Sequence, residues 1–159
     1  MNILIPAISL LFSFPVWADF TGIVVKVSDG DTIQVQDDKG ALHKIRLAGI
    51  DAPEKKQDYG IISRDNLSKS IAFKPVTVKS KKIDRYGREL GKVLLDNADV
   101  NLAQVKAGLA WHYKKYERDQ TTEDRVNYSS SEKEARAFKY GLWNSDKQIP
   151  PWDYRKGLR

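Results

Sequence analysis

The sequence of 159 residues contains no cysteine and only two histidines, His43 and His112. These scarcities exclude disulfide bonds, zinc–thiolate sites, iron–sulfur clusters, a cysteine nucleophile and a metal site made of three histidines. Acidic residues are outnumbered, with 21 Asp and Glu against 27 Lys and Arg, so the net charge of +6 favours an anionic partner. The length suits one domain, and 4 Trp, 7 Tyr and 5 Phe supply the apolar surface that a disordered chain lacks.

Residues 3–18 carry no charged side chain, and this run predicts a signal peptide. It is shorter than the roughly 20 residues of a membrane-spanning helix, and it contains Pro6 and Pro15. Because it ends in Val16-Trp17-Ala18, we expect cleavage after Ala18 and a secreted or periplasmic protein without a membrane anchor. Only the amino terminus supplies positive charge before the run, so a buried N-terminal strand is the alternative.

The rest of the chain divides into a folded domain over residues 19–146 and a basic tail over residues 147–159, which we expect to be loosely held. Polar–apolar alternation and turn residues predict strands over residues 20–27, 32–36, 42–50, 76–78 and 89–95. Helices are expected over residues 59–73 and 100–109, and a third follows from a helical stripe of Tyr128, Ser131, Ala135, Phe138 and Leu142. Five strands and three helices indicate an α+β domain with a small closed or partly closed sheet.

A predicted hairpin gathers three carboxylates. If the chain turns at residues 38–40, antiparallel register places Asp31 opposite residues 46–49, and Asp51 and Glu54 follow within a few residues. Three carboxylates in one place repel one another unless a cation lies between them. An oxygen-only set without His or Cys favours a hard ion, Ca²⁺ or Mg²⁺.

Arg46 lies in the same predicted hairpin, where it would repel a metal ion. Its presence is explained if an anion such as a phosphodiester completes the cluster. The alternative interpretation is that Asp29-Gly30 and Asp51-Ala52-Pro53 are ordinary turn residues. The convergence of several such motifs across one hairpin favours a functional site.

Three longer motifs carry a family resemblance: Val27-Ser28-Asp29-Gly30-Asp31-Thr32, residues 45–54 and Asp84-Arg85-Tyr86-Gly87-Arg88. Shorter ones follow at Val100-Asn101-Leu102, residues 107–110, Glu134-Ala135 and Gly141-Leu142-Trp143. In order and spacing these motifs resemble the staphylococcal nuclease (thermonuclease) family, over nearly all of residues 20–145. The resemblance implies a five-stranded OB-type barrel carrying three helices. It also implies a calcium-dependent phosphodiesterase that acts on DNA and RNA and leaves 3′-phosphate ends.

Carried over residue by residue, the resemblance implies that Asp31, Asp51 and the backbone carbonyl of Ala52 are calcium ligands. Glu54 would orient or deprotonate the attacking water, and the sequence does not decide between these two roles. Arg46 and Arg88 would hold the phosphate, which suits a planar guanidinium because it donates two parallel hydrogen bonds.

Aromatic and basic residues predict a nucleotide groove, with Tyr86, Tyr113 and Tyr116 as stacking partners for bases and Arg85 beside them. Phosphates could be tracked by the lysines at positions 79, 81, 82, 114 and 115, together with Arg118. Core packing is the alternative for each ring, and a solvated basic face is the alternative for the lysines. His112 is expected to be a packing residue.

Three functional classes remain open at this point. A secreted or periplasmic, monomeric, calcium-dependent nuclease accounts for Asp31, Arg46, Asp51, Glu54 and Arg88 together. A non-catalytic nucleic-acid-binding OB module would have no reason to contain all five. A structural calcium-binding or adhesion domain is disfavoured by the two arginines.

Overall fold

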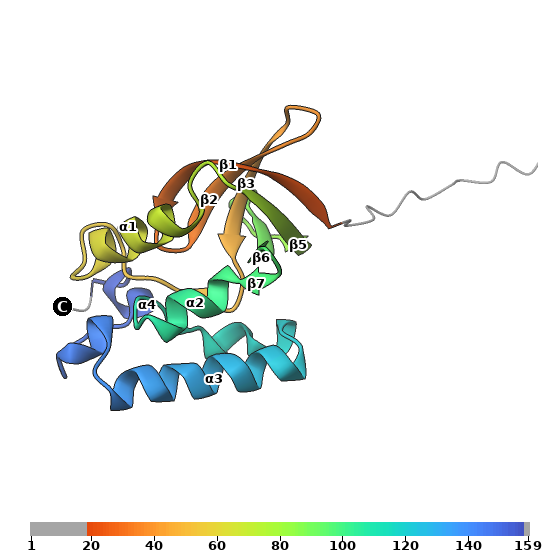
Figure 1. Cartoon of the computed structure of the whole chain (residues 1–159). Coiled ribbons are helices and arrows are strands. Elements are labelled where there is room, and N and C mark those ends of the chain that lie inside the picture. Colours follow the sequence, from red (N-terminus) through yellow and green to blue (C-terminus); the bar gives the residue numbers. More distant parts are fainter. Residues whose placement is uncertain (1–18, 158–159) are drawn as a thin grey trace, which may run out of the picture.

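The computed structural model describes residues 19–157, so the predicted signal peptide and the last two residues lie outside the described part of the chain. Five strands form a barrel: β1 (Phe20–Asp29), β2 (Thr32–Asp37), β3 (Leu42–Leu47), β5 (Pro75–Ile83) and β6 (Glu89–Leu95). Their order is β3-β2-β1-β5-β6, and parallel pairing of β3 with β6 closes the ring (Figure 1). The predicted α+β barrel is therefore confirmed.

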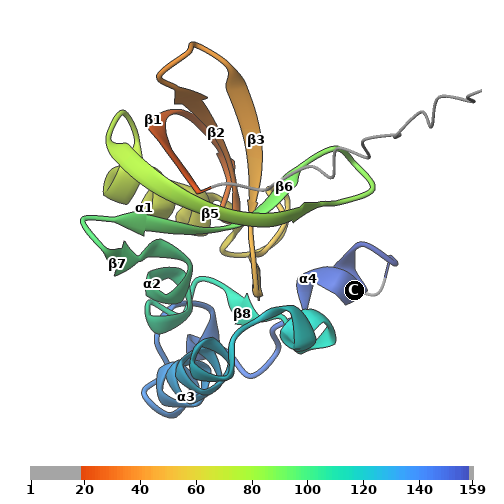
Figure 2. The ribbon, with the colours of Figure 1, turned by 90° about the vertical axis from the view of Figure 1, so that its right-hand side faces the viewer.

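Three longer helices accompany the barrel: α1 (Gly60–Ile71), α2 (Val100–Lys106) and α3 (Thr122–Ala137). Shorter elements are η1 (Lys114–Asp119), η2 (Gly141–Asn144), α4 (Pro151–Tyr154) and the two-residue strands β4 (Ile50–Asp51), β7 (Ala98–Asp99) and β8 (Trp111–His112). In Figures 1 and 2, α2 and α3 form a layer beneath the barrel. Within residues 19–157, no helix is long and apolar enough to cross a membrane.

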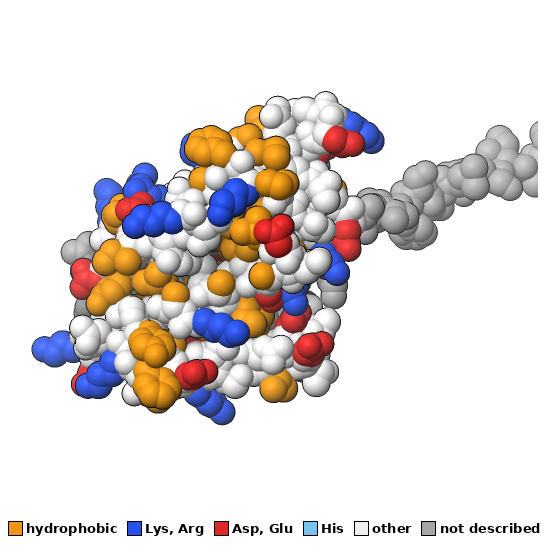
Figure 3. All heavy atoms as spheres, in the orientation of Figure 1, with side chains coloured by type: hydrophobic (Ala, Val, Ile, Leu, Met, Phe, Trp, Pro, Cys, Tyr) orange, Lys and Arg blue, Asp and Glu red, His pale blue; other side chains and the backbone are white. Residues whose placement is uncertain are grey.

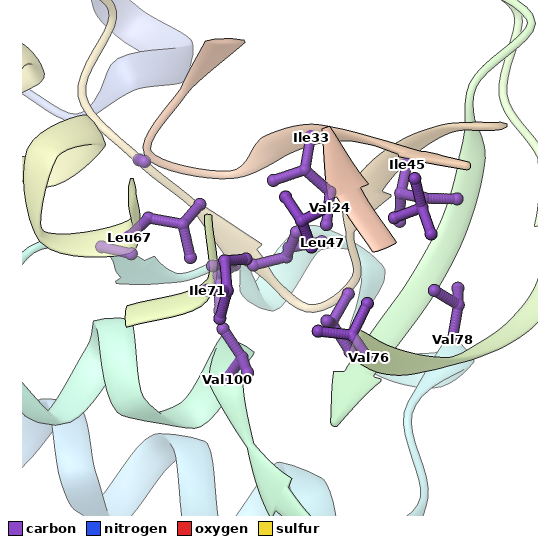
Figure 4. Packing of buried hydrophobic residues seen from close by; sticks show 14 of the residues in the cluster. Val24, Ile33, Ile45, Leu47, Leu67, Ile71, Val76, Val78 and Val100 are labelled. Atoms are coloured by element: carbon purple, nitrogen blue, oxygen red, sulfur yellow. The ribbon is translucent and has the colours of Figure 1, made fainter. Parts of the chain in front are cut away.

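The hydrophobic core lies inside the barrel and extends to α1 and α2. Alternate residues of the strands point inward, and those labelled in Figure 4 are Val24, Ile33, Ile45, Leu47, Val76 and Val78. Leu67 and Ile71, four residues apart on α1, join the same cluster from the helix, as does Val100 of α2. This core fixes the ends of β2 and β3, from which the candidate site is built.

The strand expected over residues 42–50 is divided in two, and the division has a structural reason. β3 ends at Leu47, Gly49 adopts a positive φ of 77°, and β4 then pairs with β8 instead of with a barrel strand. The side chain of Asn101 holds the bend by donating a hydrogen bond to the carbonyl of Ala48 (3.0 Å). Asp51 is thereby carried out of the barrel wall.

The helical stripe is confirmed for Tyr128, Ser131 and Ala135, which are buried on α3, but it is wrong for Phe138. Helix α3 ends at Ala137, and the ring of Phe138 is 62% exposed and stacks on Tyr140 instead of entering the core. The chain turns through Lys139 and Gly141, which both have positive φ, and Leu142 then becomes buried as part of η2. The periodic pattern thus continued past the real end of the helix.

His43 on β3 makes stability depend on pH. Its ring nitrogens contact Glu89 (2.7 Å) and Asp37 (3.1 Å), and although burial lowers the pKa of His43, these two carboxylates raise it above its usual value. The folded state therefore binds this proton more tightly than the unfolded chain does. The stabilisation is complete below about pH 6.5 and is lost as pH rises through the folded-state pKa.

We therefore expect His43→Gln to lower the free energy of unfolding more at pH 6 than at pH 9. Urea denaturation of both proteins at the two pH values measures this difference. An equal loss at both pH values would show that the two ion pairs do not contribute.

Candidate active site

The candidate site forms where β2 begins and β3 ends. Thr32 pairs with Arg46 across the β2–β3 hairpin, and the amide of Leu47 donates to the carbonyl of Asp31 (2.8 Å). The predicted placement of Asp31 opposite the end of β3 is therefore confirmed. The bend after β3 then brings β4, with Asp51, to the same place.

Arg46 is the centre of the cluster. Its Nη2 lies 3.0 Å from Asp31 Oδ2 and 2.8 Å from Asp51 Oδ1, so one nitrogen joins both carboxylates. Its Nη1 donates to the carbonyls of Leu47 and Ile50, each at 3.0 Å. Arg46, Asp31 and Asp51 are all buried, and the guanidinium is held by four contacts before any ligand arrives.

Asp31 is held from two sides. Its Oδ2 accepts a hydrogen bond from the amide of Ala52 (2.7 Å), and its Oδ1 accepts one from the hydroxyl of Thr32 (3.1 Å). Burial raises the pKa of Asp31 well above its usual range, and the opposing charge of Arg46 does not cancel that effect. A second positive charge beside this carboxylate would therefore be favourable.

The glycine before Asp31 permits a close approach. A Cβ on Gly30 would lie 1.9 Å from Ser63 Oγ and 2.7 Å from Ala52 Cβ. Helix α1 and the loop that follows β4 therefore both press on this turn, and Gln104 also donates to the carbonyl of Gly30 (2.9 Å). Gly30 therefore does more than allow a turn. Because it has no side chain, the turn that carries Asp31 can lie close to the Ala52 loop.

Gly60, the first residue of α1, supports Glu54 in a similar way. A Cβ at Gly60 would lie 1.9 Å from the backbone oxygen of Glu54, which is too close for any side chain. We expect Gly60→Ala to displace the Glu54 loop and to lower the free energy of unfolding by about 1–3 kcal/mol, as overpacking does. Urea denaturation measures the loss, and Ile61→Ala, at the half-exposed next position, should change stability by less than about 0.5 kcal/mol. Equal effects of the two variants would contradict this packing argument.

Arg155 is a member of the site that the sequence analysis did not identify. Its Nη1 and Nη2 lie 3.1 Å and 2.8 Å from the two oxygens of Asp51, and Nη1 is also 2.7 Å from Glu54 Oε1. The residue belongs to the tail that was expected to be loosely held. None of the motifs given above contains Arg155, and its contacts with Asp51 and Glu54 join distant positions of the chain, which local sequence patterns do not reveal.

Arg88 immediately precedes β6, and its guanidinium pairs with Asp84 rather than with the carboxylates of the cluster. Its Nε and Nη2 both lie 2.8 Å from Asp84 Oδ2, across the turn between β5 and β6. Its guanidinium carbon is 5.4 Å from the ring centre of Tyr86, and that of Arg85 is 4.8 Å from the same ring. The turn thus holds two arginines around one exposed aromatic ring.

A groove of about 1730 Å³ connects these parts. It is lined by the β5–β6 turn and by the segments η1 and α4, and it includes every predicted site residue, namely Asp31, Arg46, Asp51, Ala52, Glu54, Arg85, Tyr86, Arg88, Tyr113 and Tyr116. The ring of Trp152 stacks on Tyr113 at 5.3 Å, and Tyr116 packs edge-on against Tyr113 at 5.1 Å. The sequence analysis did not identify Trp152 as a groove residue.

Basic residues also line the groove, although not all of the predicted ones do. Lys79, Lys82, Lys114 and Lys115 lie along it, whereas Arg118 is exposed outside it, and the side chain of Lys81 is not described. On the face drawn in Figure 3, basic side chains are interspersed with acidic and hydrophobic ones.

His112 is buried, bonds Gln120 (2.8 Å) and packs against Tyr128, which agrees with the predicted packing role.

The donor set at the cluster suits a hard cation. Within the described part of the chain, no three acidic or histidine side chains come close enough to form a complete metal site by themselves. Asp31 and Asp51 nevertheless share one guanidinium nitrogen, and both bring only oxygen atoms. Two carboxylates, a backbone carbonyl and water satisfy Ca²⁺, which accepts irregular oxygen coordination. The residues present therefore fit such an ion.

Known proteins resemble this chain over most of its length. The model of a family described as Staphylococcal nuclease homologue matches residues 44–145. An "Uncharacterized endonuclease" of Escherichia coli O157:H7 is 47% identical over 153 residues, which cover 95% of each chain. A "Micrococcal nuclease" of Shigella flexneri is 38% identical over 162 residues, covering 96% of this chain and 90% of the relative. A further "Uncharacterized endonuclease", from Haemophilus influenzae, is 39% identical over 133 residues, covering 84% of this chain and 71% of the relative.

Proposed function

Because this chain belongs to the staphylococcal nuclease family, we propose that it is a calcium-dependent nuclease that hydrolyses phosphodiester bonds of DNA and RNA and leaves 3′-phosphate ends. Family membership and the nuclease names of its relatives support nuclease activity. The observation that carries the proposal is the contact of one buried arginine, Arg46, with Asp31 and Asp51, to which Glu54 is joined through Arg155. Such a buried charge cluster is costly for a purely structural domain, because its charges have been taken out of water.

Asp31, Asp51 and the carbonyl of Ala52 would hold the calcium ion. Bound there, calcium would neutralise charge on a phosphoryl oxygen and lower the pKa of a bound water. The buried Asp31 carboxylate, whose pKa is raised by burial, supports this assignment because it favours a compensating cation.

The chain's own side chains would supply the remaining chemistry. Glu54 lies at the rim of the cluster with its side chain 38% exposed, so water can reach its carboxylate. It would take a proton from the water that attacks phosphorus, while the bond from phosphorus to the 5′-oxygen breaks and that oxygen takes a proton from solvent to leave as a 5′-hydroxyl. This direction of cleavage leaves the phosphate on the 3′-oxygen.

The two arginines would bind the phosphate from different sides. Four contacts hold the Nη atoms of Arg46, and within the described chain no hydrogen bond involves its Nε, which is left to donate to a phosphate. Arg88 would exchange its partner Asp84 for a phosphate oxygen. Both contacts stabilise the negative charge that grows on the phosphoryl oxygens in the transition state.

Digestion of plasmid DNA and of single-stranded RNA by purified residues 19–159 tests the proposal. We expect cleavage in calcium and none after addition of a calcium-selective chelator. The same protein without cleavage, but with retained oligonucleotide binding, would identify the alternative, a non-catalytic nucleic-acid-binding OB module. Full activity in magnesium alone would contradict the choice of calcium.

We also propose that the protein is secreted or periplasmic after cleavage behind Ala18. The uncharged run over residues 3–18 supports this location. Expression of the full sequence in a bacterium, followed by mass spectrometry of the intact protein, should give a chain that begins at Asp19. A cytoplasmic protein that retains residues 1–18 would contradict it.

A further inference from the structure

The C-terminal segment, residues 149–157, packs over the loop that carries Glu54. The ring of Trp152 stacks on Tyr113 and meets Trp111 edge-on at 5.4 Å. Gln57, three residues beyond Glu54, donates to the carbonyl of Ile149. The segment is thus attached both to the β8 region and to the chain just beyond Glu54.

Arg155 extends from this attached segment into the site. Its two bonds to the oxygens of Asp51 form a fork, and the shared Nη1 also reaches Glu54 at 2.7 Å. Among the described residues, Arg155 is the one side chain that hydrogen-bonds the Glu54 carboxylate. Asp51 is buried, and its carboxylate is held by Arg46. The Arg155 guanidinium therefore connects the flexible Glu54 side chain to a carboxylate that is fixed in place.

The direction of the Glu54 carboxylate therefore depends on Arg155. A glutamate side chain has several rotatable bonds, and a partly exposed one samples many rotamers unless a partner selects one. A planar guanidinium suits this task, because it can bind one carboxylate through two nitrogens and a second through a remaining hydrogen.

We propose that Arg155 is a positioning residue that aims the Glu54 carboxylate at the reacting water by tying it to Asp51. The inference rests on the proposed nuclease function, and it gives the C-terminal segment a part in the reaction. Two other roles would use the same contact differently: Arg155 could bind the phosphate directly, or it could occupy the cluster as a tethered cation that excludes calcium.

A double-mutant cycle separates these roles. The proteins are wild type, Arg155→Gln, Glu54→Gln and the double variant, and kcat and KM are measured on one oligonucleotide. We expect Arg155→Gln to lower kcat by about ten- to a hundredfold, because a misplaced catalytic group costs that much, with KM nearly unchanged. In the Glu54→Gln background, the same replacement should change kcat by less than about twofold, since the two residues act as a unit.

Two further variants control the experiment. Arg155→Lys keeps the charge and should recover part of kcat, and it covers the case in which Arg155→Gln does not fold. Arg64→Gln removes an arginine of α1 outside the groove and should leave kcat unchanged.

Calcium affinity without nucleotide, measured by isothermal titration calorimetry, supplies a readout that is independent of turnover. For Arg155→Gln it should be unchanged or tighter, because a positive charge leaves Asp51. A tenfold loss of affinity would overturn the proposal, since Arg155 would then act by holding the metal ligand.

Two kinetic outcomes would also overturn it. If the losses of kcat in the two single variants add up in the double variant, Arg155 acts independently of Glu54 and binds the phosphate. If kcat rises in Arg155→Gln, Arg155 is a cation that blocks the site. Failure of the proposed function is a separate result, because the wild type itself would then not cleave the oligonucleotide.

Discussion

Replacing Glu54 by glutamine should lower kcat for phosphodiester hydrolysis by about 10²–10⁴-fold, the usual contribution of a general base. Glutamine has the same shape, and its carbonyl oxygen still accepts a hydrogen bond, so the loop and its contact with Arg155 should persist. The amide cannot take a proton from water, so only the base is lost. Calcium affinity and oligonucleotide affinity are expected to stay close to those of the wild type. Single-turnover rates and calorimetry on the same protein measure the three quantities.

Glu134→Gln is the matched control for this replacement, because Glu134 is an exposed residue of α3 outside the groove. It should leave the rate unchanged. If Glu54→Gln cleaves DNA as fast as Glu134→Gln does, Glu54 is only a loop carboxylate, and another group must activate the water.

Replacing Arg46 by alanine should lower the free energy of unfolding by about 3–5 kcal/mol in the absence of calcium. The reason is that Asp31 would remain buried without its charged partner, and the buried Asp51 would keep only its contact with Arg155. Calcium should therefore stabilise Arg46→Ala more than it stabilises the wild type, because the ion replaces the missing positive charge. Urea denaturation with calcium and with chelator measures both effects.

Arg64→Ala removes an arginine from a partly exposed pair with Asp65 and serves as the control. Exposed pairs contribute at most about 1 kcal/mol, so its loss should be small and independent of calcium. Similar losses in Arg46→Ala and Arg64→Ala would show that the cluster is not a buried charge network. The activity of Arg46→Ala should also fall, since a phosphate-binding guanidinium is gone.

The core of the candidate site could be predicted from sequence because it depends on local rules. Alternation in residues 32–36 and the turn that follows determine which residue faces Arg46, and the observed pairing of Thr32 with Arg46 agrees. β6 likewise spans residues 89–95, as the alternation and the preceding turn predict. Asp31, Arg46 and Asp51 meet because one hairpin and one bend bring them together.

The remaining features depend on contacts between distant parts of the chain. The bend at Gly49 is held by Asn101, and Glu54 is tied to Arg155, one hundred and one positions later. Phe138 fitted the helical period, yet the helix stops one residue before it. Hydrophobic periodicity describes a local surface, and it contains no information about which distant segment covers that surface or ends the helix.

Hydrolysis in water enriched in ¹⁸O tests the central claim most directly. The substrate is a 5′-labelled single-stranded DNA oligonucleotide, digested in calcium by purified residues 19–159, and the products are analysed by mass spectrometry. Attack of water on phosphorus with loss of the 5′-oxygen predicts that ¹⁸O appears in a 3′-phosphate, and that this product is depleted about 10²–10⁴-fold in the Glu54→Gln protein. A product that carries ¹⁸O in a 5′-phosphate, or an oligonucleotide left intact, would contradict the account.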